Sequence, residues 1–304
     1  MPTPSAGLVD LHRHLDGSLR PATLRELAER QGLPVPPDLA FSPGMGLHAA
    51  LSRFAFVLSV LRTPDRVQRV ASEICEDAAA DGVTTLEIRF APQLHVGGSV
   101  SAIVDAALAG IDGRAGLILC GLYGEDPAVL DGLVDVAVGR PGVVGLDLAG
   151  GPAPGASWGL TAYARSFRRA ADLGLGRTVH AGEGRPPHEI RQAIEVLGAQ
   201  RIGHGTTLLH DPAVLELVLD RGVTIEACPT SNVHTGVIPA VAAHPLPRWL
   251  DAGVRVTVCT DNTLLSAVCA SEELERAASI PGMDASKVTA TVEHGRAAAF
   301  RRGR

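Results

Sequence analysis

The segment Val9-Asp10-Leu11-His12-Arg13-His14 has the pattern of an apolar strand that ends in two histidines. Successive side chains of a strand point to opposite faces, so His12 and His14 share one face and Arg13 takes the other. Far along the chain, Thr257-Val258-Cys259-Thr260-Asp261-Asn262 ends another apolar strand in a carboxylate. Neutral imidazoles and a carboxylate suit zinc or a neighbouring divalent transition metal. We therefore predict that the two strand ends form opposite sides of one metal site.

Two more apolar runs end in a histidine. Arg177-Thr178-Val179-His180 is followed at once by Ala181-Gly182-Glu183, and Arg201-Ile202-Gly203-His204 is followed by Gly205. One such histidine alone would more often have a structural role, whereas four at the ends of strands favour a shared site. We expect solvated positions for the histidines in predicted helices and loops, which are His48, His188, His210, His234, His244 and His294.

Short apolar runs alternate with helical patterns along the chain. This alternation predicts a (β/α)8 TIM barrel, a fold that typically takes about 250 residues, as a single domain over residues 1–304. The carboxyl ends of all strands in such a barrel line one mouth, so the polar residues at those ends converge. The expected strands are Gly7 to Leu11, Thr84 to Phe90, Gly116 to Gly121, Gly142 to Leu148, Arg177 to His180, Gln200 to Gly203, Gly222 to Ala227 and Gly253 to Cys259.

The segment from Pro34 to Pro64 interrupts this alternation between the first and second strands. It contains an amphipathic pattern from Leu47 to Leu61 that predicts a helix. Such an insertion either covers the barrel mouth as a lid or packs at the periphery.

Composition excludes several classes of protein. A formal charge of -6 and a pI near 6.0 give no electrostatic reason to bind nucleic acid, and we expect Arg301-Arg302-Gly303-Arg304 to be a solvated tail. Arginines flank the strongest apolar run, Ala55 to Leu61, so we expect no membrane insertion. The five cysteines are odd in number and have no Cys-x-x-Cys spacing, which predicts reduced thiols in the cytoplasm.

Seven short motifs follow one another along the chain. They are Asp10-Leu11-His12-Arg13-His14-Leu15-Asp16-Gly17-Ser18, Glu87-Ile88-Arg89-Phe90-Ala91-Pro92-Gln93-Leu94-His95, Gly145-Leu146-Asp147-Leu148-Ala149-Gly150, Val179-His180-Ala181-Gly182-Glu183, Arg201-Ile202-Gly203-His204-Gly205, Cys228-Pro229-Thr230-Ser231-Asn232 and Thr260-Asp261-Asn262. By these motifs the sequence resembles the adenosine deaminase family of the amidohydrolase superfamily over nearly its whole length.

The resemblance implies one zinc ion per chain and three catalytic residues. By this likeness His204 and Asp261 orient the attacking water, and Glu183 faces the purine ring. A carboxylic acid at position 183 suits donation of a proton to purine N1. The alternatives are that Glu183 starts a helix and that His204 is a further metal ligand. The metal ligands implied by the resemblance are His12, His14, His180 and Asp261.

The same resemblance assigns three contacts to a purine nucleoside. Asp16 would meet the ribose, the backbone of Gly150 would meet purine N3, and Asn262 would donate to N7. Many family members have an aspartate where this chain has Asn262, but a neutral amide donates without having to be protonated. The alternative for Asp16 is a cap of the helix that begins near Pro21.

The expected reaction is hydrolytic deamination of adenosine or 2′-deoxyadenosine to inosine or 2′-deoxyinosine and ammonia. The alternative is a sibling enzyme that acts on adenine, on a 5′-modified adenosine such as aminodeoxyfutalosine, or on an N6-substituted adenine nucleotide. A purine-binding barrel without turnover is a third possibility, which the full set of site residues argues against. Lys287 is the only lysine and follows the last strand, so a bridging lysine for a second metal is not expected.

Overall fold

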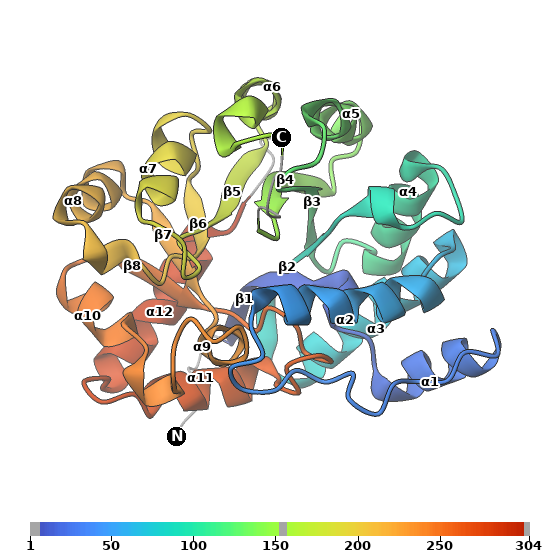
Figure 1. The fold of residues 1–304 in the computed structure, drawn as a ribbon, viewed down its shortest axis with the longest axis horizontal. Coiled ribbons are helices and arrows are strands. Elements are labelled where there is room, and N and C mark those ends of the chain that lie inside the picture. The colour runs from blue at the N-terminus through green and yellow to red at the C-terminus, as the bar shows by residue number, and fades with distance from the viewer. Residues whose placement is uncertain (1–6, 152–156, 301–304) are drawn as a thin grey trace.

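A computed structural model describes residues 7–151 and 157–300; the ends 1–6 and 301–304, with the predicted tail, lie outside the described residues. Eight parallel strands pair in chain order, each with the next. Figure 1 shows the strands in the middle and helices around them, which confirms the predicted (β/α)8 barrel. The strands are β1 (Leu8–His14), β2 (Val83–Phe90), β3 (Gly116–Leu122), β4 (Val143–Ala149), β5 (Gly176–Ala181), β6 (Arg201–His204), β7 (Thr224–Ala227) and β8 (Arg255–Val258).

The helices between the strands begin at local capping signals. Asp126 and Asp211 each accept a hydrogen bond from the backbone two residues ahead, and each is followed by a proline in the first helical turn. The helices are α1 (Pro21–Glu29), α2 (Leu47–Val60), α3 (Pro64–Ala80), α4 (Val100–Ile111), α5 (Pro127–Ala137), α6 (Ala164–Asp172), α7 (His188–Glu195), α8 (Pro212–Arg221), α9 (Pro229–His234), α10 (Leu246–Asp251), α11 (Ala270–Ala278) and α12 (Ala285–Ala298).

Helix α2 occupies the insertion between β1 and β2, where the sequence predicts a helix. Leu51 and Phe54 of this helix line both cavities at the barrel mouth, and Figure 1 shows α2 beside β1. The helix therefore forms part of the wall of the mouth. That it moves as a lid stays a prediction.

The first and last strands meet through a single bridge. Arg13 pairs with Asp261 in parallel. The Asp261 N–H donates to the His12 carbonyl and the His14 N–H donates to the Asp261 carbonyl, both at 2.8 Å. These two bonds nearly close the barrel and align residues from its two ends.

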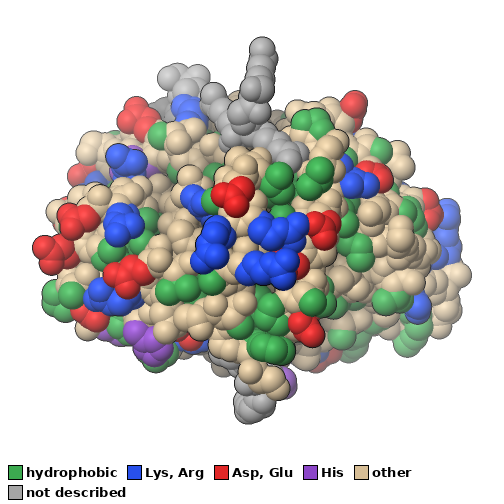
Figure 2. Space-filling view, turned by 90° about the horizontal axis from the view of Figure 1, so that it is seen from above, with side chains coloured by type: hydrophobic (Ala, Val, Ile, Leu, Met, Phe, Trp, Pro, Cys, Tyr) green, Lys and Arg blue, Asp and Glu red, His purple; other side chains and the backbone are tan. Residues whose placement is uncertain are grey.

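Charges of both signs are mixed on the surface. On the face shown in Figure 2, a basic group lies in the middle with acidic side chains on both sides. Arg169 of α6, for example, pairs with Asp131 and Asp135 of α5. In the described part of the chain, no helix is long and apolar enough to cross a membrane.

Candidate active site

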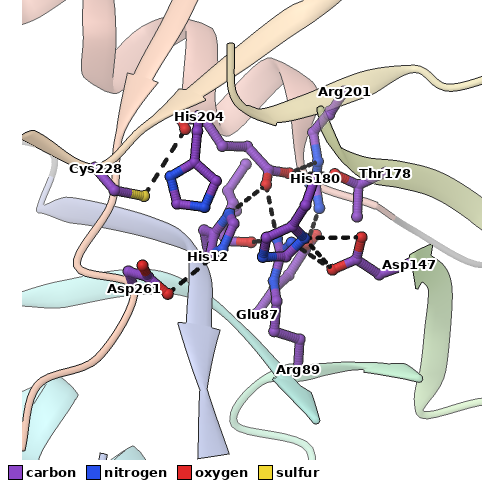
Figure 3. Close-up of polar contacts among 12 residues, drawn as sticks. His12, Glu87, Arg89, Asp147, Thr178, His180, Arg201, His204, Cys228 and Asp261 are labelled. Atoms are coloured by element: carbon purple, nitrogen blue, oxygen red, sulfur yellow. Dashed lines mark hydrogen bonds and ion pairs between the residues drawn. The ribbon is translucent and has the colours of Figure 1, made fainter. Parts of the chain in front are cut away.

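The four proposed metal ligands meet at the carboxyl ends of the strands. His12 and His14 end β1, His180 lies in β5, and Asp261 follows β8. Figure 3 shows His12, His180 and Asp261 close together. His14 Nε2 lies 3.2 Å from His180 Nε2 and 3.4 Å from Asp261 Oδ1, and His12 Nε2 lies 3.7 Å from the same oxygen. His204 ends β6, and the centroid of its ring lies 5.0 Å from the ring centroid of His12. The barrel thus gathers residues that are far apart in sequence into one cluster.

The donor atoms of this cluster fit a divalent metal ion. Burial is the main reason that the pKa values of His12 and His14 lie well below the usual value, so both imidazoles are neutral. His12 Nδ1 lies 2.7 Å from Glu226 Oε2, whereas His12 Nε2 is buried without a hydrogen-bond partner. Because the carboxylate accepts, Nδ1 carries the hydrogen and Nε2 directs its lone pair at the cluster.

Charged side chains inside the barrel hold these imidazoles in place. Asp147 of β4 lies 3.1 Å from His180 Nδ1 and 2.8 Å from Arg89 of β2 (Figure 3). Arg89 also lies 2.8 Å from Glu226 of β7. The sequence analysis missed Arg89 and Glu226 as parts of the site. The available signal was a charged residue in the middle of a strand expected to face the barrel interior.

We expect Arg89→Met to destabilise the fold strongly. The Arg89 side chain is fully buried, and its loss leaves the carboxylates of Asp147 and Glu226 without their shared cation. Removing one partner of a buried ion pair typically costs about 3–5 kcal/mol. Urea unfolding of the metal-free protein measures the change. Arg165→Met is the control, because the Arg165 side chain is 77% exposed and should contribute little. Equal effects of the two substitutions would contradict the prediction.

Glu183 lies in the turn after β5, between two glycines with positive φ. It is 4% exposed; its Oε1 accepts from Thr235 Oγ1 at 3.1 Å, and its Oε2 lies 3.7 Å from His204 Nε2. Burial raises the pKa of its carboxyl group. Helix α7 begins only at His188. The geometry therefore gives no support to the alternative that Glu183 starts this helix.

Two residues of the cluster have strained backbones. His204 has a φ of 67° and Asp261 a φ of 62°, in the left-handed region that non-glycine residues rarely adopt. Such strain is concentrated at functional sites. Burial lowers the pKa of His204 to about 3, so its imidazole is neutral.

The three residues expected to bind the nucleoside line the same mouth. Asp16 and Asn262 are buried, and Oδ1 of each has no hydrogen-bond partner. Burial raises the pKa of Asp16 to about 7. A Cβ at Gly17 would lie 1.8 Å from Asn262 Oδ1, so only glycine lets the two segments approach this closely. Gly150 has a φ of 74° and lines both cavities.

The alternative that Asp16 caps the next helix finds no support in the geometry. Asp16 lies in a short 3-10 turn, Leu15–Gly17, whereas α1 begins at Pro21. Arg20 occupies the N-cap position, without a side-chain capping bond. Asp16 is therefore free to face the cavity.

Two adjoining cavities make up the mouth. The smaller, of about 50 Å³, is lined by Glu183, His204 and Asn262, among others. The larger, of about 320 Å³, is lined by Asp16 and by apolar side chains such as Leu94 and Leu122. Among the described residues, no lysine or arginine lines either cavity. The site thus offers donors and acceptors at one end and an apolar wall at the other.

The expectation of solvated positions is wrong for two histidines. His234 is 8% and His244 is 3% exposed. His244 Nε2 lies 3.2 Å from Asn232 Oδ1, and Asn232 Nδ2 lies 3.0 Å from His204 Nδ1. His234 ends helix α9 and His244 lies in the loop before α10, positions in which surface histidines are common, but here both segments pack onto the barrel mouth.

Comparisons with known proteins agree on one family. The family model described as Adenosine deaminase matches residues 7–302. An adenosine deaminase of Serratia proteamaculans is 36% identical over 314 residues, which cover 96% of this chain and 93% of that protein. The structure of an adenine deaminase from Arthrobacter aurescens is similar with a TM-score of 0.85 at 25% identity, and covers 97% of this chain and 94% of its own. An Arabidopsis N6-mAMP deaminase is similar with a TM-score of 0.86 at 25% identity and the same coverage.

Proposed function

The chain belongs to the adenosine deaminase family, and we propose that it hydrolyses adenosine and 2′-deoxyadenosine to inosine and 2′-deoxyinosine with release of ammonia. The observation that carries this proposal is the buried carboxyl group of Glu183, 3.7 Å from His204 Nε2 and in the pocket of the imidazole cluster. Replacing the amino group at C6 requires a proton donor for N1 and a nucleophile for C6. Groups suited to both tasks lie side by side here.

We propose that one zinc ion per chain is held by His12, His14, His180 and Asp261. The unpartnered Nε2 of His12 and the neutral imidazoles support this set. When bound, the ion would supply the nucleophile by lowering the pKa of a water molecule towards about 7. Lys287 of α12 is the only lysine, and it forms an ion pair with Asp251 of α10 at 2.7 Å. This position supports a site with one metal ion rather than two ions bridged by a lysine.

The catalytic roles follow from where the side chains lie. Glu183 donates a proton to purine N1, because burial keeps its carboxyl group protonated to higher pH than that of a free glutamate. His204 and Asp261 face the side from which C6 is attacked. The amino group then takes a further proton, which comes from the attacking water, and leaves C6 as ammonia while the C6 oxygen becomes the carbonyl. Apolar side chains of helix α2, among them Leu51 and Phe54, form one wall of this end of the pocket.

The proposed substrate contacts use the remaining polar groups of the mouth. The amide of Asn262 donates to purine N7, and the backbone N–H of Gly150 donates to N3. Asp16 holds a ribose hydroxyl at the border of the larger cavity. The lack of lysine and arginine among the described lining residues favours a nucleoside over a nucleotide.

A second candidate is a sibling reaction on adenine, on a 5′-modified adenosine such as aminodeoxyfutalosine, or on an N6-substituted adenine nucleotide. Its support is the similarity to an adenine deaminase and an N6-mAMP deaminase at 25% identity. The apolar wall of Leu94 and Leu122 also leaves room beyond a ribose.

We expect adenosine to be the preferred substrate and Asp16→Ala to lower its kcat/KM by about 10- to 100-fold. Above its pKa of about 7 Asp16 is a charged acceptor, and a hydrogen bond to such a group is worth about 1.5–3 kcal/mol. The measurement is kcat/KM for adenosine, 5′-deoxyadenosine, adenine, AMP and aminodeoxyfutalosine with both proteins. If Asp16→Ala slows adenosine and 5′-deoxyadenosine equally, the contact to the 5′-hydroxyl is wrong. If adenine or a 5′-modified nucleoside clearly outruns adenosine in the native protein, the second candidate replaces the first.

We also propose a cytoplasmic location. All five cysteines are free thiols, and four of them are buried. Persistent thiols are typical of a reducing compartment.

A further inference from the structure

We propose that Asn232 and His244 are positioning residues that fix the tautomer of His204, so that His204 Nε2 carries the hydrogen and faces the reacting groups as a donor. This inference rests on the proposed function, but the bonds that carry it are a property of the fold. They form one chain of three hydrogen bonds from helix α10 to the barrel mouth.

This chain of hydrogen bonds begins at a group that can act only as a donor. The backbone N–H of Leu246 can only donate, and it lies 3.2 Å from His244 Nδ1. His244 Nδ1 is therefore an acceptor and carries no hydrogen. A histidine with one bare nitrogen is neutral and has its hydrogen on the other, so His244 Nε2 is a donor.

The next two bonds take their direction from the first. His244 Nε2 lies 3.2 Å from the Asn232 side chain and donates to it, so the amide oxygen faces His244. The amide nitrogen then faces His204 Nδ1 at 3.0 Å and donates to it. His204 Nδ1 is thus an acceptor, and the hydrogen of the neutral imidazole lies on Nε2.

Burial keeps this arrangement in place. His204, Asn232 and His244 are each at most 3% exposed, so water does not compete for their polar atoms. Trp249 packs edge-on against the His244 ring with 5.2 Å between the ring centroids. Burial also lowers the pKa of His244 to about 3, in agreement with its neutral form.

The tautomer separates the roles that remained open for His204. A bare Nε2 could accept a proton or bind the metal, whereas an Nε2 that carries a hydrogen donates. Its position 3.7 Å from Glu183 Oε2 places this donor in the substrate pocket. His204 therefore stabilises the oxygen that adds to C6 by a hydrogen bond. The hydrogen itself is not transferred in this role.

The direct test is the ¹⁵N spectrum of the native protein labelled at histidine, with and without zinc, with the His204 signals assigned by substitution. A ring nitrogen that carries a hydrogen resonates far from one that does not. We expect a bare Nδ1 and a hydrogen-bearing Nε2 for His204 in both samples. A hydrogen on Nδ1, or an Nε2 bound to zinc, would overturn the proposal. The spectrum does not depend on turnover, so failure to deaminate adenosine would count against the proposed function alone.

A matched pair of variants tests the effect on catalysis. His244→Gln keeps a donor near the position of Nε2, whereas His244→Leu removes it. We expect His244→Gln to keep the tautomer and most of the activity. We expect His244→Leu to populate both tautomers and to lower kcat by roughly 10-fold or more with a nearly unchanged KM, part of the ~100-fold cost of losing one such donor. An unchanged His204 spectrum in folded His244→Leu would show that the hydrogen bonds through His244 and Asn232 do not set the tautomer of His204.

Discussion

Glu183→Gln should lower kcat for adenosine by at least ~100-fold, the usual contribution of general acid catalysis, while the fold and the metal content stay unchanged. The amide keeps the shape of the side chain and still accepts from Thr235 Oγ1. It has no proton to give to purine N1. The measurement is steady-state kinetics on protein whose metal content has been determined.

The pH dependence gives a second check on the same residue. Burial raises the pKa of Glu183 above its usual value. The protonated form is the active one, so kcat of the native enzyme should be highest below this raised pKa and fall as the pH rises through it. The residual activity of Glu183→Gln should lack this fall. Glu195→Gln, at the exposed end of α7, is the control and should behave like the native enzyme. Near-normal turnover of metal-loaded Glu183→Gln would leave Glu183 with a structural role only.

His180→Ala is expected to lose the metal and the activity together. His180 lies at the centre of the cluster, 3.2 Å from His14 Nε2, and Asp147 orients its ring. The substitution removes one imidazole donor, and we expect the three remaining residues to hold zinc too weakly to keep it through dialysis. Elemental analysis after dialysis, combined with the deaminase assay, measures both losses.

A graded substitution makes this prediction sharper. Asp147→Asn keeps His180 but removes the charge behind it, and changes of this kind typically weaken metal binding by about 10–100-fold. The order of metal affinity should therefore be native, Asp147→Asn, His180→Ala. His188→Ala, at an exposed position on α7, should equal the native protein. Retention of one metal per chain by His180→Ala, or two metals per chain in the active native protein, would contradict the proposed ligand set.

The sequence predicts the barrel well because each strand is a short apolar run with its own flanking turns. The predicted ends of three strands differ from the observed ends by more than one residue, each for a physical reason. β1 continues to His14 rather than Leu11, since its backbone still pairs with β2 beyond the apolar residues. β7 and β8 begin two residues later than expected, because Gly222 and Gly253 have positive φ values and belong to the preceding turns.

The proposed ligands and catalytic residues could be inferred because they sit at strand ends, where parallel strands converge. Arg89 and Glu226 carry one signal, a charge within an apolar strand, but their roles and that of His244 depend on partners that lie far away in sequence. A charge within an apolar strand, or a histidine in a loop, gives no local sign of its partner. The amphipathic pattern likewise predicts the helix α2 and says nothing of whether it moves as a lid.

We expect the joint between β1 and β8 to determine when the newly made protein can first hold the proposed metal ion. The two backbone bonds that close the barrel are the ones that bring Asp261 against His12 and His14. During synthesis the chain emerges at about 5–20 residues per second, so Asp261 leaves the ribosome roughly 12–50 s after His12. We therefore expect nascent chains that stop before β8 to bind zinc weakly, and the metal to enter only after the last strand is in place.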